Sequence, residues 1–478
     1  MNSLLDLRIL GSLLAAIGVV QWIPILAALL FHERVFPLAA SSLACLVVGL
    51  SVAVPARPHD AALRNRDGFL VVSFGWILAS LFGALPYAIA DVLGPVDALF
   101  ESVSGFTTTG STVLLDIEAV PRSLLLWRAI TQWLGGMGII VFALAILPIL
   151  GIGGMQLFKA EIPGPTADKL RPRIVSTARR LLYIYVGFTI AESVLLWGAG
   201  LSFYEAVCHA LTTVSTGGFS TRNASLGAYD SAVVEWIVIA FMALGGINFA
   251  LHYRMLSGDV RTVVRDTELR YFTAVVAVST VAITGLLLDA GLHEGDELRT
   301  ALFQVVAILT TTGFGTADFE LWPTLSLVIL LQLMIFGGMA GSTSGGVKDV
   351  RVILGFRVLR NALARALHPR SVANVKYGGH TVPIDVLAGV WAFLTAYICI
   401  ALLATGVMAL AGYDLVSSVT AALTAIGNVG PGLGEVGPTE PFSHLPSYAK
   451  LTLAFCMLAG RLEIYTVIML LLPDFWRR

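Results

Sequence analysis

The stretch SGFTTTGST, residues 104–112, decides how the rest of the chain is read, because its tetrapeptide TTTG returns at residues 310–313. Each copy follows a short, mostly apolar segment and lies between long hydrophobic runs. Threonine and glycine are common in turns, so one copy alone would indicate only turn chemistry. A polar loop that recurs at such a distance indicates an internal repeat.

The composition indicates a membrane protein. The chain has 478 residues, of which 57% are hydrophobic and only 13% charged, and its mean hydropathy is +0.84. Soluble domains carry about 25% charged residues. Long apolar runs recur throughout, and about 20 such residues are enough to cross a bilayer as a helix. The first run, residues 10–31, is too long for a signal peptide and is predicted to be retained.

We therefore predict an all-α polytopic membrane protein with ten transmembrane helices. The spans are expected at residues 8–31, 35–55, 69–90, 123–150, 181–201, 231–256, 271–290, 323–348, 382–412 and 447–473. Basic residues gather in alternate loops, among them 56–68 and 348–376. The positive-inside rule makes these loops and both termini cytoplasmic. A docking surface for a cytosolic partner is the alternative use of the basic residues, with 348–376 as the candidate contact.

The TTTG loop has two further relatives on the outer side of the spans. Four apolar segments too short to cross the membrane each precede a glycine-containing loop, and in order they read ALFESVSGFTTTGST, AVCHALTTVSTGGFST, ALFQVVAILTTTGFGT and SVTAALTAIGNVGPG. Their aligned glycines are Gly110, Gly218, Gly313 and Gly430. The chain thus reads as four units of span, half-helix, loop and span, preceded by two extra spans.

This alignment divides the chain into five parts. They are two N-terminal transmembrane helices (1–66), pore repeat 1 with a basic loop (67–178), pore repeat 2 (179–268), pore repeat 3 with an intramembrane gating loop and a basic segment (269–380) and pore repeat 4 (381–478). A pair of adjacent small residues recurs after each loop, at Gly135-Gly136, Gly245-Gly246, Gly337-Gly338 and Ala459-Gly460. Close helix packing explains such pairs, and convergence of four spans on a constriction is a compatible reading.

Four re-entrant loops predict a pore. Non-helical backbone inside a bilayer is tolerated only against protein or a water-filled cavity, since its N–H and C=O groups cannot be satisfied by lipid. Glycine reaches φ values closed to other residues, and a ring of carbonyl oxygens can replace the hydration shell of a monovalent cation. The half-helices would direct their partially negative C-termini at the ion. No carboxylate stands at the aligned glycines, which argues against a divalent-cation filter.

The motifs SGFTTTGST, TTVSTGGFST, TTTGFGT, GNVGPGLG, GGMAGSTSGGVK and AGRLEIYT resemble those of the Trk/Ktr/HKT superfamily of potassium transporters. The resemblance covers the chain from about residue 69 to its end, and the two extra spans are similar to those of the TrkH branch. It implies a K⁺-translocating subunit of the bacterial inner membrane, present as a homodimer and regulated by a cytosolic nucleotide-binding ring of the RCK/TrkA type. It implies no bound cofactor and no nucleic acid, with K⁺ as the transported ion.

The resemblance also assigns residues. The carbonyls expected to line the ion path belong to Thr108, Thr109, Gly110, Thr216, Gly217, Gly218, Thr311, Thr312, Gly313, Asn428, Val429 and Gly430. In plant relatives that favour sodium, serine replaces the glycine of the first loop, so Gly110 points to potassium. The fourth loop departs most from the pattern, because Asn428 stands where the others have threonine.

A second site is expected just inside the filter. The residues of the predicted gating loop are Gly337, Gly338, Gly341, Ser342, Thr343, Ser344, Gly345 and Gly346. Glycine costs about 1 kcal/mol in a helix relative to alanine, so a break in the helix is predicted, with small-residue packing as the alternative. Arg461 occupies mid-membrane depth, where a charge should face a cavity or a partner. It is expected to raise the barrier for cations and to hold the loop; a structural pair with Glu463 or with backbone carbonyls is the alternative.

The half-helices carry Glu101, His209 and Gln304 at one aligned position, nine residues before each loop glycine. We predict that they brace the filter through hydrogen bonds; a negative potential supplied by Glu101 is the alternative. A Na⁺-coupled or Na⁺-permeable symporter of the same superfamily remains the second hypothesis for function. A membrane enzyme, the third, would need a cluster of His, Asp, Glu or Cys at membrane depth, which the sequence lacks.

Overall fold

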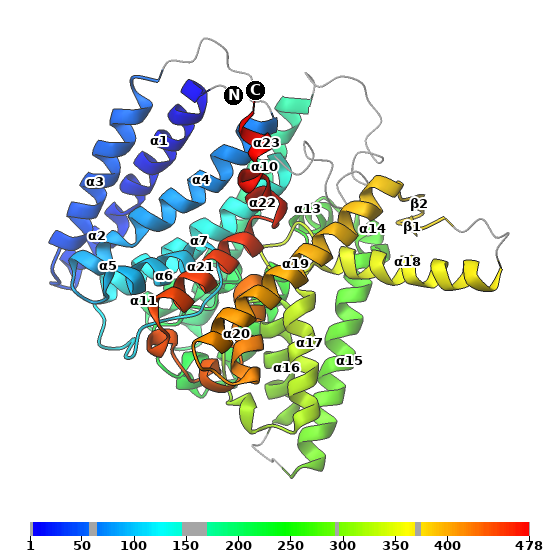
Figure 1. Cartoon of the computed structure of the whole chain (residues 1–478). Coiled ribbons are helices and arrows are strands. Elements are labelled where there is room, and N and C mark those ends of the chain that lie inside the picture. The colour runs from blue at the N-terminus through cyan, green and yellow to red at the C-terminus, as the bar shows by residue number, and fades with distance from the viewer. Residues whose placement is uncertain (1–2, 57–64, 146–169, 292–295, 369–373, 478) are drawn as a thin grey trace.

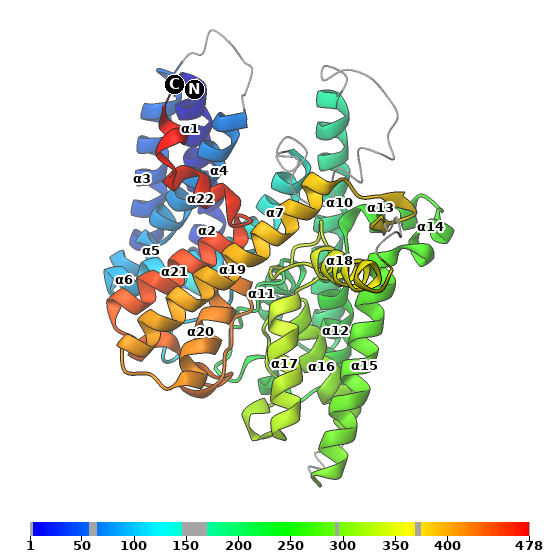
Figure 2. The same ribbon diagram turned by 45° about the vertical axis from the view of Figure 1, so that its right-hand side comes forward.

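A computed structural model describes residues 3–56, 65–145, 170–291, 296–368 and 374–477 of the chain. Within these residues it is almost entirely helical, and the only strands are the antiparallel pair β1 (Lys376–Tyr377) and β2 (His380–Thr381) (Figure 1). The two ends of the chain lie beside each other in both views of the ribbon (Figures 1 and 2). The architecture therefore agrees with the predicted all-α fold.

Three helices precede the repeats: α1 (Ser3–Val20), α2 (Trp22–Leu30) and α3 (Phe36–Ala53). Helices α1 and α3 approach closely, because a Cβ at Gly11 would lie 2.6 Å from the carbonyl oxygen of Gly49 and one at Gly49 would lie 2.7 Å from that of Gly11. Small residues bring helix backbones together in membranes, where packing rather than apolar area drives association. These glycines thus explain why the extra helices form a tight pair.

Four units of similar build follow. The first has α4 (Asn65–Gly83), α5 (Leu85–Ile89), α6 (Pro95–Phe106) and α7 (Arg122–Ala145), and the second has α10 (Leu170–Gly198), α11 (Phe203–Val214), α12 (Ala232–Gly246), α13 (Phe249–Leu256) and α14 (Val260–Arg265). The third has α15 (Thr267–Asp289), α16 (Glu297–Leu309), α17 (Thr324–Phe336) and α18 (Asp349–Leu367). The fourth has α19 (Ile384–Leu410), α20 (Leu415–Gly427), α21 (Ser447–Arg461), α22 (Tyr465–Leu471) and α23 (Pro473–Trp476). Short 3₁₀ turns lie between them at Ser225–Tyr229, Phe319–Leu321, Gly434–Val436 and Phe442–His444.

The predicted half-helices are α6, α11, α16 and α20, and each begins at a local signal. Helix α6 starts with Pro95, whose missing N–H costs nothing at the first helical position. The other three begin after Ser202, Asp296 and Asp414, whose side chains accept hydrogen bonds from backbone N–H groups of the first turn. The segments are thus helical by their own sequence, although each is too short to cross a bilayer.

The four units close into a ring through their half-helices. Each half-helix packs against the first long helix of its own unit, and it also packs against the return helix of a neighbouring unit. The neighbouring pairs are α7 with α11, α12 with α16, α17 with α20 and α21 with α6. Because the last pair joins the fourth unit to the first, the chain surrounds a central axis.

Several predicted spans are continuous helices, and others are interrupted. Among the residues that the structure describes, six helices are long and apolar enough to cross a membrane. The predicted spans 231–256 and 447–473 are instead pairs bent by 103° and 116°, and the helix expected over 323–348 stops at Phe336. Backbone geometry explains two of the breaks, since Gly337 has φ 74° and Glu463 and Ile464 have φ 61° and 49°. Three predicted segments lie partly outside the described residues. They are the end of the span 123–150, most of loop 56–68 and part of segment 348–376.

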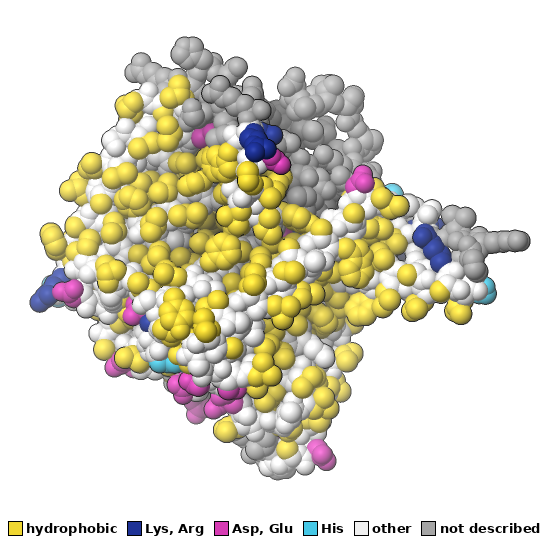
Figure 3. Space-filling model, viewed as in Figure 1, with side chains coloured by type: hydrophobic (Ala, Val, Ile, Leu, Met, Phe, Trp, Pro, Cys, Tyr) yellow, Lys and Arg dark blue, Asp and Glu magenta, His cyan; other side chains and the backbone are white. Residues whose placement is uncertain are grey.

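The surface agrees with a bilayer environment. Apolar side chains cover most of the face seen in Figure 3, and charged side chains lie mainly towards its margins. Many large exposed side chains are apolar along the span helices, among them Leu402 and Leu403 of α19 at 65% and 72% exposure. A water-soluble protein rarely exposes so large a continuous apolar area. These helices therefore present their outer faces to lipid.

Candidate ion pathway

The four loops that follow the half-helices, here the repeat loops (residues 107–110, 215–218, 310–313 and 427–430), share one backbone conformation. A non-glycine residue with positive φ occurs once in each, and these are Thr108 (54°), Thr216 (53°), Thr311 (56°) and Asn428 (55°). Two residues later comes the aligned glycine, with φ of 87°, 78°, 74° and 109° in chain order. Positive φ strains ordinary residues. Its recurrence at equivalent positions confirms that the alignment of the four loops is structural.

Each repeat loop is fastened to its own half-helix by the same hydrogen bond. The backbone N–H of the residue just before the aligned glycine donates to a carbonyl oxygen near the end of the half-helix. Thr109 N donates to Ser104 O at 2.9 Å, and Thr312 N donates to Ala307 O at 2.8 Å. The second and fourth loops repeat this with Gly217 to Thr212 at 2.8 Å and Val429 to Thr424 at 3.0 Å. Terminal carbonyls of each half-helix are satisfied in this way. The negative ends of the helix dipoles consequently point at the repeat loops.

The aligned glycines bring the four loops together around the axis. A Cβ added at each of them would lie within 3.0 Å of a carbonyl oxygen of the next loop, closer than real Cβ atoms approach. The four contacts, given as glycine and oxygen, are Gly110 with Gly217 O, Gly218 with Thr312 O, Gly313 with Val429 O and Gly430 with Thr109 O. The contacts run from loop to loop and return to the first. Only glycine fits at these positions, both for its φ and for its lack of a side chain.

The side chains of the repeat loops turn into the protein. Thr108, Thr216, Thr311 and Asn428 are at most 1% exposed. The Thr109 hydroxyl lies 2.8 Å from that of Thr107, and Asn428 Nδ2 donates to Thr109 Oγ1 and to Met457 O, both at 2.9 Å. These bonds tie the fourth loop to the first.

Two of the predicted carbonyls also accept hydrogen bonds from the protein. Gly217 O accepts from Gln132 Nε2 at 2.5 Å, and Gly430 O accepts from Ser111 Oγ at 2.9 Å. A carbonyl oxygen has two lone pairs and can serve a second partner. The structure thus holds the second and fourth loops more firmly than the sequence alignment indicated.

Directly beneath the loops, the third return helix is interrupted as predicted. Helix α17 ends at Phe336, and the glycine-rich segment (residues 337–346) crosses the molecule before α18 begins at Asp349. Its contacts reach three units: Thr343 N donates to Gly245 O at 3.2 Å, Gly345 N to Thr311 Oγ1 at 2.7 Å and Gly346 N to Gly427 O at 2.8 Å. The glycines of the break are also closely packed, as the alternative proposed, since a Cβ at Gly345 would lie 2.3 Å from Gly427 O.

Arg461 contacts this segment from the fourth unit. Its side chain is 2% exposed, Nη1 donates to Thr343 O at 2.6 Å, and Nη2 donates to Gly135 O at 3.3 Å. Of the alternative partners, Glu463 forms an ion pair with Arg351 instead, whereas backbone carbonyls do accept from Arg461 as the alternative stated. A buried arginine therefore joins the glycine-rich segment to the first unit, below the ring of loops.

The arrangement matches a known family over most of the chain. A family model described as cation transport protein, TrkH, matches residues 36–477. The chain belongs to the TrkH family of cation transport proteins. It is 41% identical over 480 residues to the Trk system potassium uptake protein TrkH of Vibrio parahaemolyticus, covering 98% of this chain and 99% of the relative. The Escherichia coli protein of the same name is 39% identical, with 98% of both chains covered.

The fold agrees with the family as well. The crystal structure of the potassium transporter TrkH from Vibrio parahaemolyticus matches with a TM-score of 0.92 and 39% identity, covering 100% of both chains. The resemblance drawn from the loop motifs is thus confirmed. These relatives are named as transport proteins, so the prediction that this TrkH-family chain is no enzyme is also confirmed.

Arg128, which the sequence did not reveal, joins the predicted Glu101 in bracing the first two repeat loops of this TrkH-family chain. Glu101 accepts from Val113 N at 2.9 Å, just after the first loop, and pairs with Arg128 of α7 at 2.6 Å. Arg128 also donates to Ser220 O at 2.9 Å and covers the Phe219 ring at 3.4 Å. One buried ion pair thus joins the chain after the first loop to that after the second. An arginine inside an apolar helix was the signal that could have marked it.

The predicted bracing holds for two of the three aligned positions. His209 lies 2.8 Å from Glu205 O through Nδ1 and 3.1 Å from Ser220 Oγ through Nε2. Gln304 is buried, and its amide has no hydrogen-bond partner among the described residues. Bracing by hydrogen bonds is therefore observed behind the first and second loops only.

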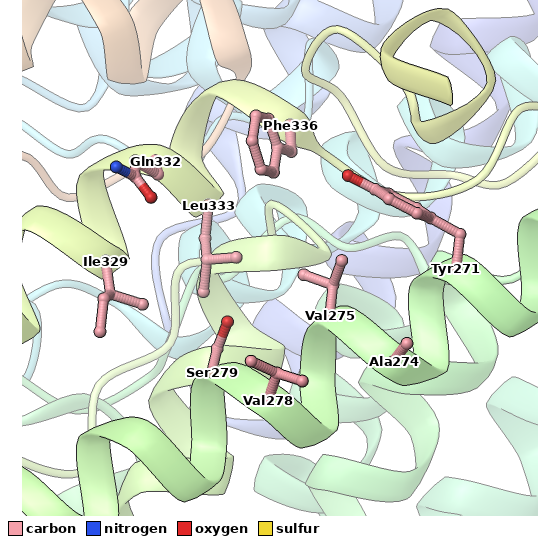
Figure 4. Close-up of a pocket in the computed structure, with 9 residues that line it drawn as sticks. All are labelled: Tyr271, Ala274, Val275, Val278, Ser279, Ile329, Gln332, Leu333 and Phe336. Carbon is pink, nitrogen blue, oxygen red and sulfur yellow. The ribbon is translucent and has the colours of Figure 1, made fainter. Parts of the chain in front are cut away.

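A cavity of about 280 Å³ opens between α15 and α17, away from the ring of loops (Figure 4). Its lining is mostly apolar, with Tyr271 and Phe336 at the end nearest the glycine-rich segment. The predicted ion-path residues take no part in it. The cavity belongs to the outer flank of the third unit.

Proposed function

We propose that this chain carries K⁺ across the bacterial inner membrane through a channel-like pore. The observation that carries the proposal is the closed succession of glycine-to-carbonyl contacts among the four repeat loops. The names of the relatives support it, since they are potassium uptake proteins. Those names do not favour the Na⁺-coupled or Na⁺-permeable symporter that the sequence left open.

In this proposal the backbone of the repeat loops is the selectivity filter. The twelve residues assigned from the family motifs supply carbonyl oxygens that replace water around K⁺. The four half-helices direct their negative ends at the ion and stabilise it there. The buried threonine and asparagine side chains hold the loops at a fixed diameter through the hydrogen bonds described above.

The glycine-rich segment is the gate in this proposal. Its contacts with the second, third and fourth units support a position across the path, below the filter. Arg461 holds it through Thr343 O and adds a positive charge that raises the barrier for cations. Opening requires the segment to leave these partners, and its five glycines allow the necessary change in backbone conformation.

The orientation and partners complete the proposal. Both termini and the basic loops face the cytoplasm, and the chain works as a homodimer. A cytosolic nucleotide-binding ring regulates it through the basic segment 348–376, where Arg357, Arg360 and Arg365 project from α18. No cofactor is proposed for the chain itself.

Uptake of ⁸⁶Rb⁺ into proteoliposomes tests the function. Gly110→Ser and Gly313→Ser each place a side chain against a neighbouring carbonyl at positive φ, a strain of about 1–2 kcal/mol. We expect uptake to fall about tenfold and Na⁺ to compete more strongly with Rb⁺. Gly187→Ser is the matched control, because nothing lies within 4 Å of a Cβ there. Well-folded filter variants with unchanged uptake and unchanged competition would refute the proposal.

A further inference from the structure

One carboxylate accepts hydrogen bonds both from the glycine-rich segment and from the start of α18. Glu268, in the first turn of α15, is 5% exposed. Its Oε1 accepts from Ala340 N at 2.7 Å and from Val350 N at 3.2 Å. Ala340 lies inside the segment and Val350 in the first turn of α18. Neither a family motif nor the alignment of the repeats marked this residue.

The residue between these two ends carries a second buried acid. Asp349 is fully buried, its backbone N–H donates to Gly338 O at 3.1 Å, and its carboxyl oxygens have no hydrogen-bond partner among the described residues. Burial raises the pKa of Asp349 well above its usual range, and nearby Glu268 raises it further. A buried acid without partners takes up a proton instead of staying charged.

The charged and titratable groups around this pair come from several elements. They are Asp266, Glu268 and Tyr271 at the start of α15, Lys348 before α18, Arg357 within α18 and Tyr377 of β1. Lys348 is the nearest positive group to Asp349, but its ammonium donates to Ser344 O of the glycine-rich segment. The closed arrangement therefore leaves Asp349 without a committed counter-charge.

We propose that Glu268 is a positioning residue that holds the glycine-rich segment in its closed position, as its clasp. We further propose that Asp349 loses its proton to water when the segment is released. This inference rests on the proposed gating role of the segment. When the segment leaves, the bond from Asp349 N to Gly338 O is lost and the carboxyl reaches water. The open state then binds one proton fewer than the closed state.

The sign of the pH dependence follows from this difference. A state that binds fewer protons gains population as the pH rises. Ionised Asp349 also attracts Lys348 away from Ser344 O, which removes a further contact of the segment. Higher pH therefore favours the open pore through Asp349, while ionisation of Glu268 strengthens its bonds to Ala340 N and Val350 N and acts in the opposite direction.

The test compares ⁸⁶Rb⁺ uptake into proteoliposomes from about pH 6 to about pH 8.5, on both sides of neutral pH. Wild-type uptake should rise with pH. Asp349→Asn has the shape of the protonated acid and loses no hydrogen bond, so it should fold, take up Rb⁺ slowly and show no such rise. Glu268→Gln exchanges two bonds to a carboxylate for bonds to a neutral amide, and its uptake should increase about fivefold towards the upper end of this range, where the carboxylate is charged. Asp385→Asn, an exposed acid at the start of α19, is the matched control.

The outcomes separate this inference from the gating proposal. If Asp349→Asn keeps the wild-type dependence on pH, the inference is overturned. If Arg461→Ala raises uptake but Glu268→Gln does not, the segment is a gate and Glu268 is not its clasp. If neither variant changes the uptake of folded protein, the gating role itself fails. Size-exclusion profiles in detergent report which variants are folded.

Discussion

Arg128 and Glu101 form an ion pair that is almost fully removed from solvent, with side chains 2% and 0% exposed. Removing one partner of a buried pair typically costs 3–5 kcal/mol, since the other charge is left without compensation. The pair also contacts the chain just after the first two repeat loops, so breaking it should change the geometry of these loops as well as the stability of the protein.

We expect Arg128→Met to destabilise the protein by about 3 kcal/mol or more. The double variant Glu101→Gln with Arg128→Met should recover part of the loss, because no charge remains buried. Arg299→Met removes a more exposed pair with Glu235, at 23% and 12% exposure, and should cost about 1 kcal/mol or less. Chemical unfolding in detergent, followed by tryptophan fluorescence, gives the comparison. Equal losses for Arg128→Met and Arg299→Met would contradict the assigned role.

Sequence reasoning reached the aligned glycines and Glu101 but not its partner Arg128. The glycines recur with a fixed motif, so four copies reinforce one another. Arg128, Gln132 and Glu268 each occur once and act on residues far away in the chain, such as Gly217 and Ala340. Such contacts depend on how the units close into a ring. An alignment of repeats within one sequence does not contain that information.

At the scale of the elements, helix ends were harder to predict than helix positions. The apolar pattern over 231–256 continues through the break after Gly246, where Ile247 is extended and Asn248 caps the next helix. The bend after Arg461 lies at Glu463 and Ile464, two residues that favour helix by composition but have positive φ here. Tertiary contacts override local preference at these places. The glycine-rich segment was predictable because its composition itself opposes a helix.

Arg461→Ala tests the proposed gate. The change removes a buried positive charge and the hydrogen bond to Thr343 O, so the glycine-rich segment should be released more often. We expect ⁸⁶Rb⁺ uptake to rise about fivefold or more, as loss of a charge-assisted bond of 1–2 kcal/mol predicts. Arg461→Lys keeps the positive charge with a less suitable hydrogen-bond geometry. Its ⁸⁶Rb⁺ uptake should lie between that of the wild type and that of Arg461→Ala. Unchanged or reduced uptake in folded Arg461→Ala would count against the gate.

At the scale of the whole molecule, the pseudo-fourfold ring explains features that no single unit explains. Each half-helix alone would leave polar backbone facing lipid, a cost that membrane proteins avoid. Closing the ring from α21 to α6 buries all four repeat loops against one another. The unit is therefore stable only as a set of four. This interdependence is why the extra helices α1 and α3 can sit outside the ring without entering the path.

The orientation of the ring is the remaining prediction, and exposed positions at its two ends test it. Leu115 follows the first repeat loop and is 79% exposed, whereas Leu367 ends α18 and is 77% exposed. Under the positive-inside rule the first lies outside the cell membrane and the second inside. In a Cys399→Ser background, which leaves only buried cysteines among the described residues, a membrane-impermeant maleimide should label Leu115→Cys in spheroplasts. Leu367→Cys should react only after the membrane is permeabilised. The reverse pattern would invert the topology and place the basic segment on the wrong side for a cytosolic partner.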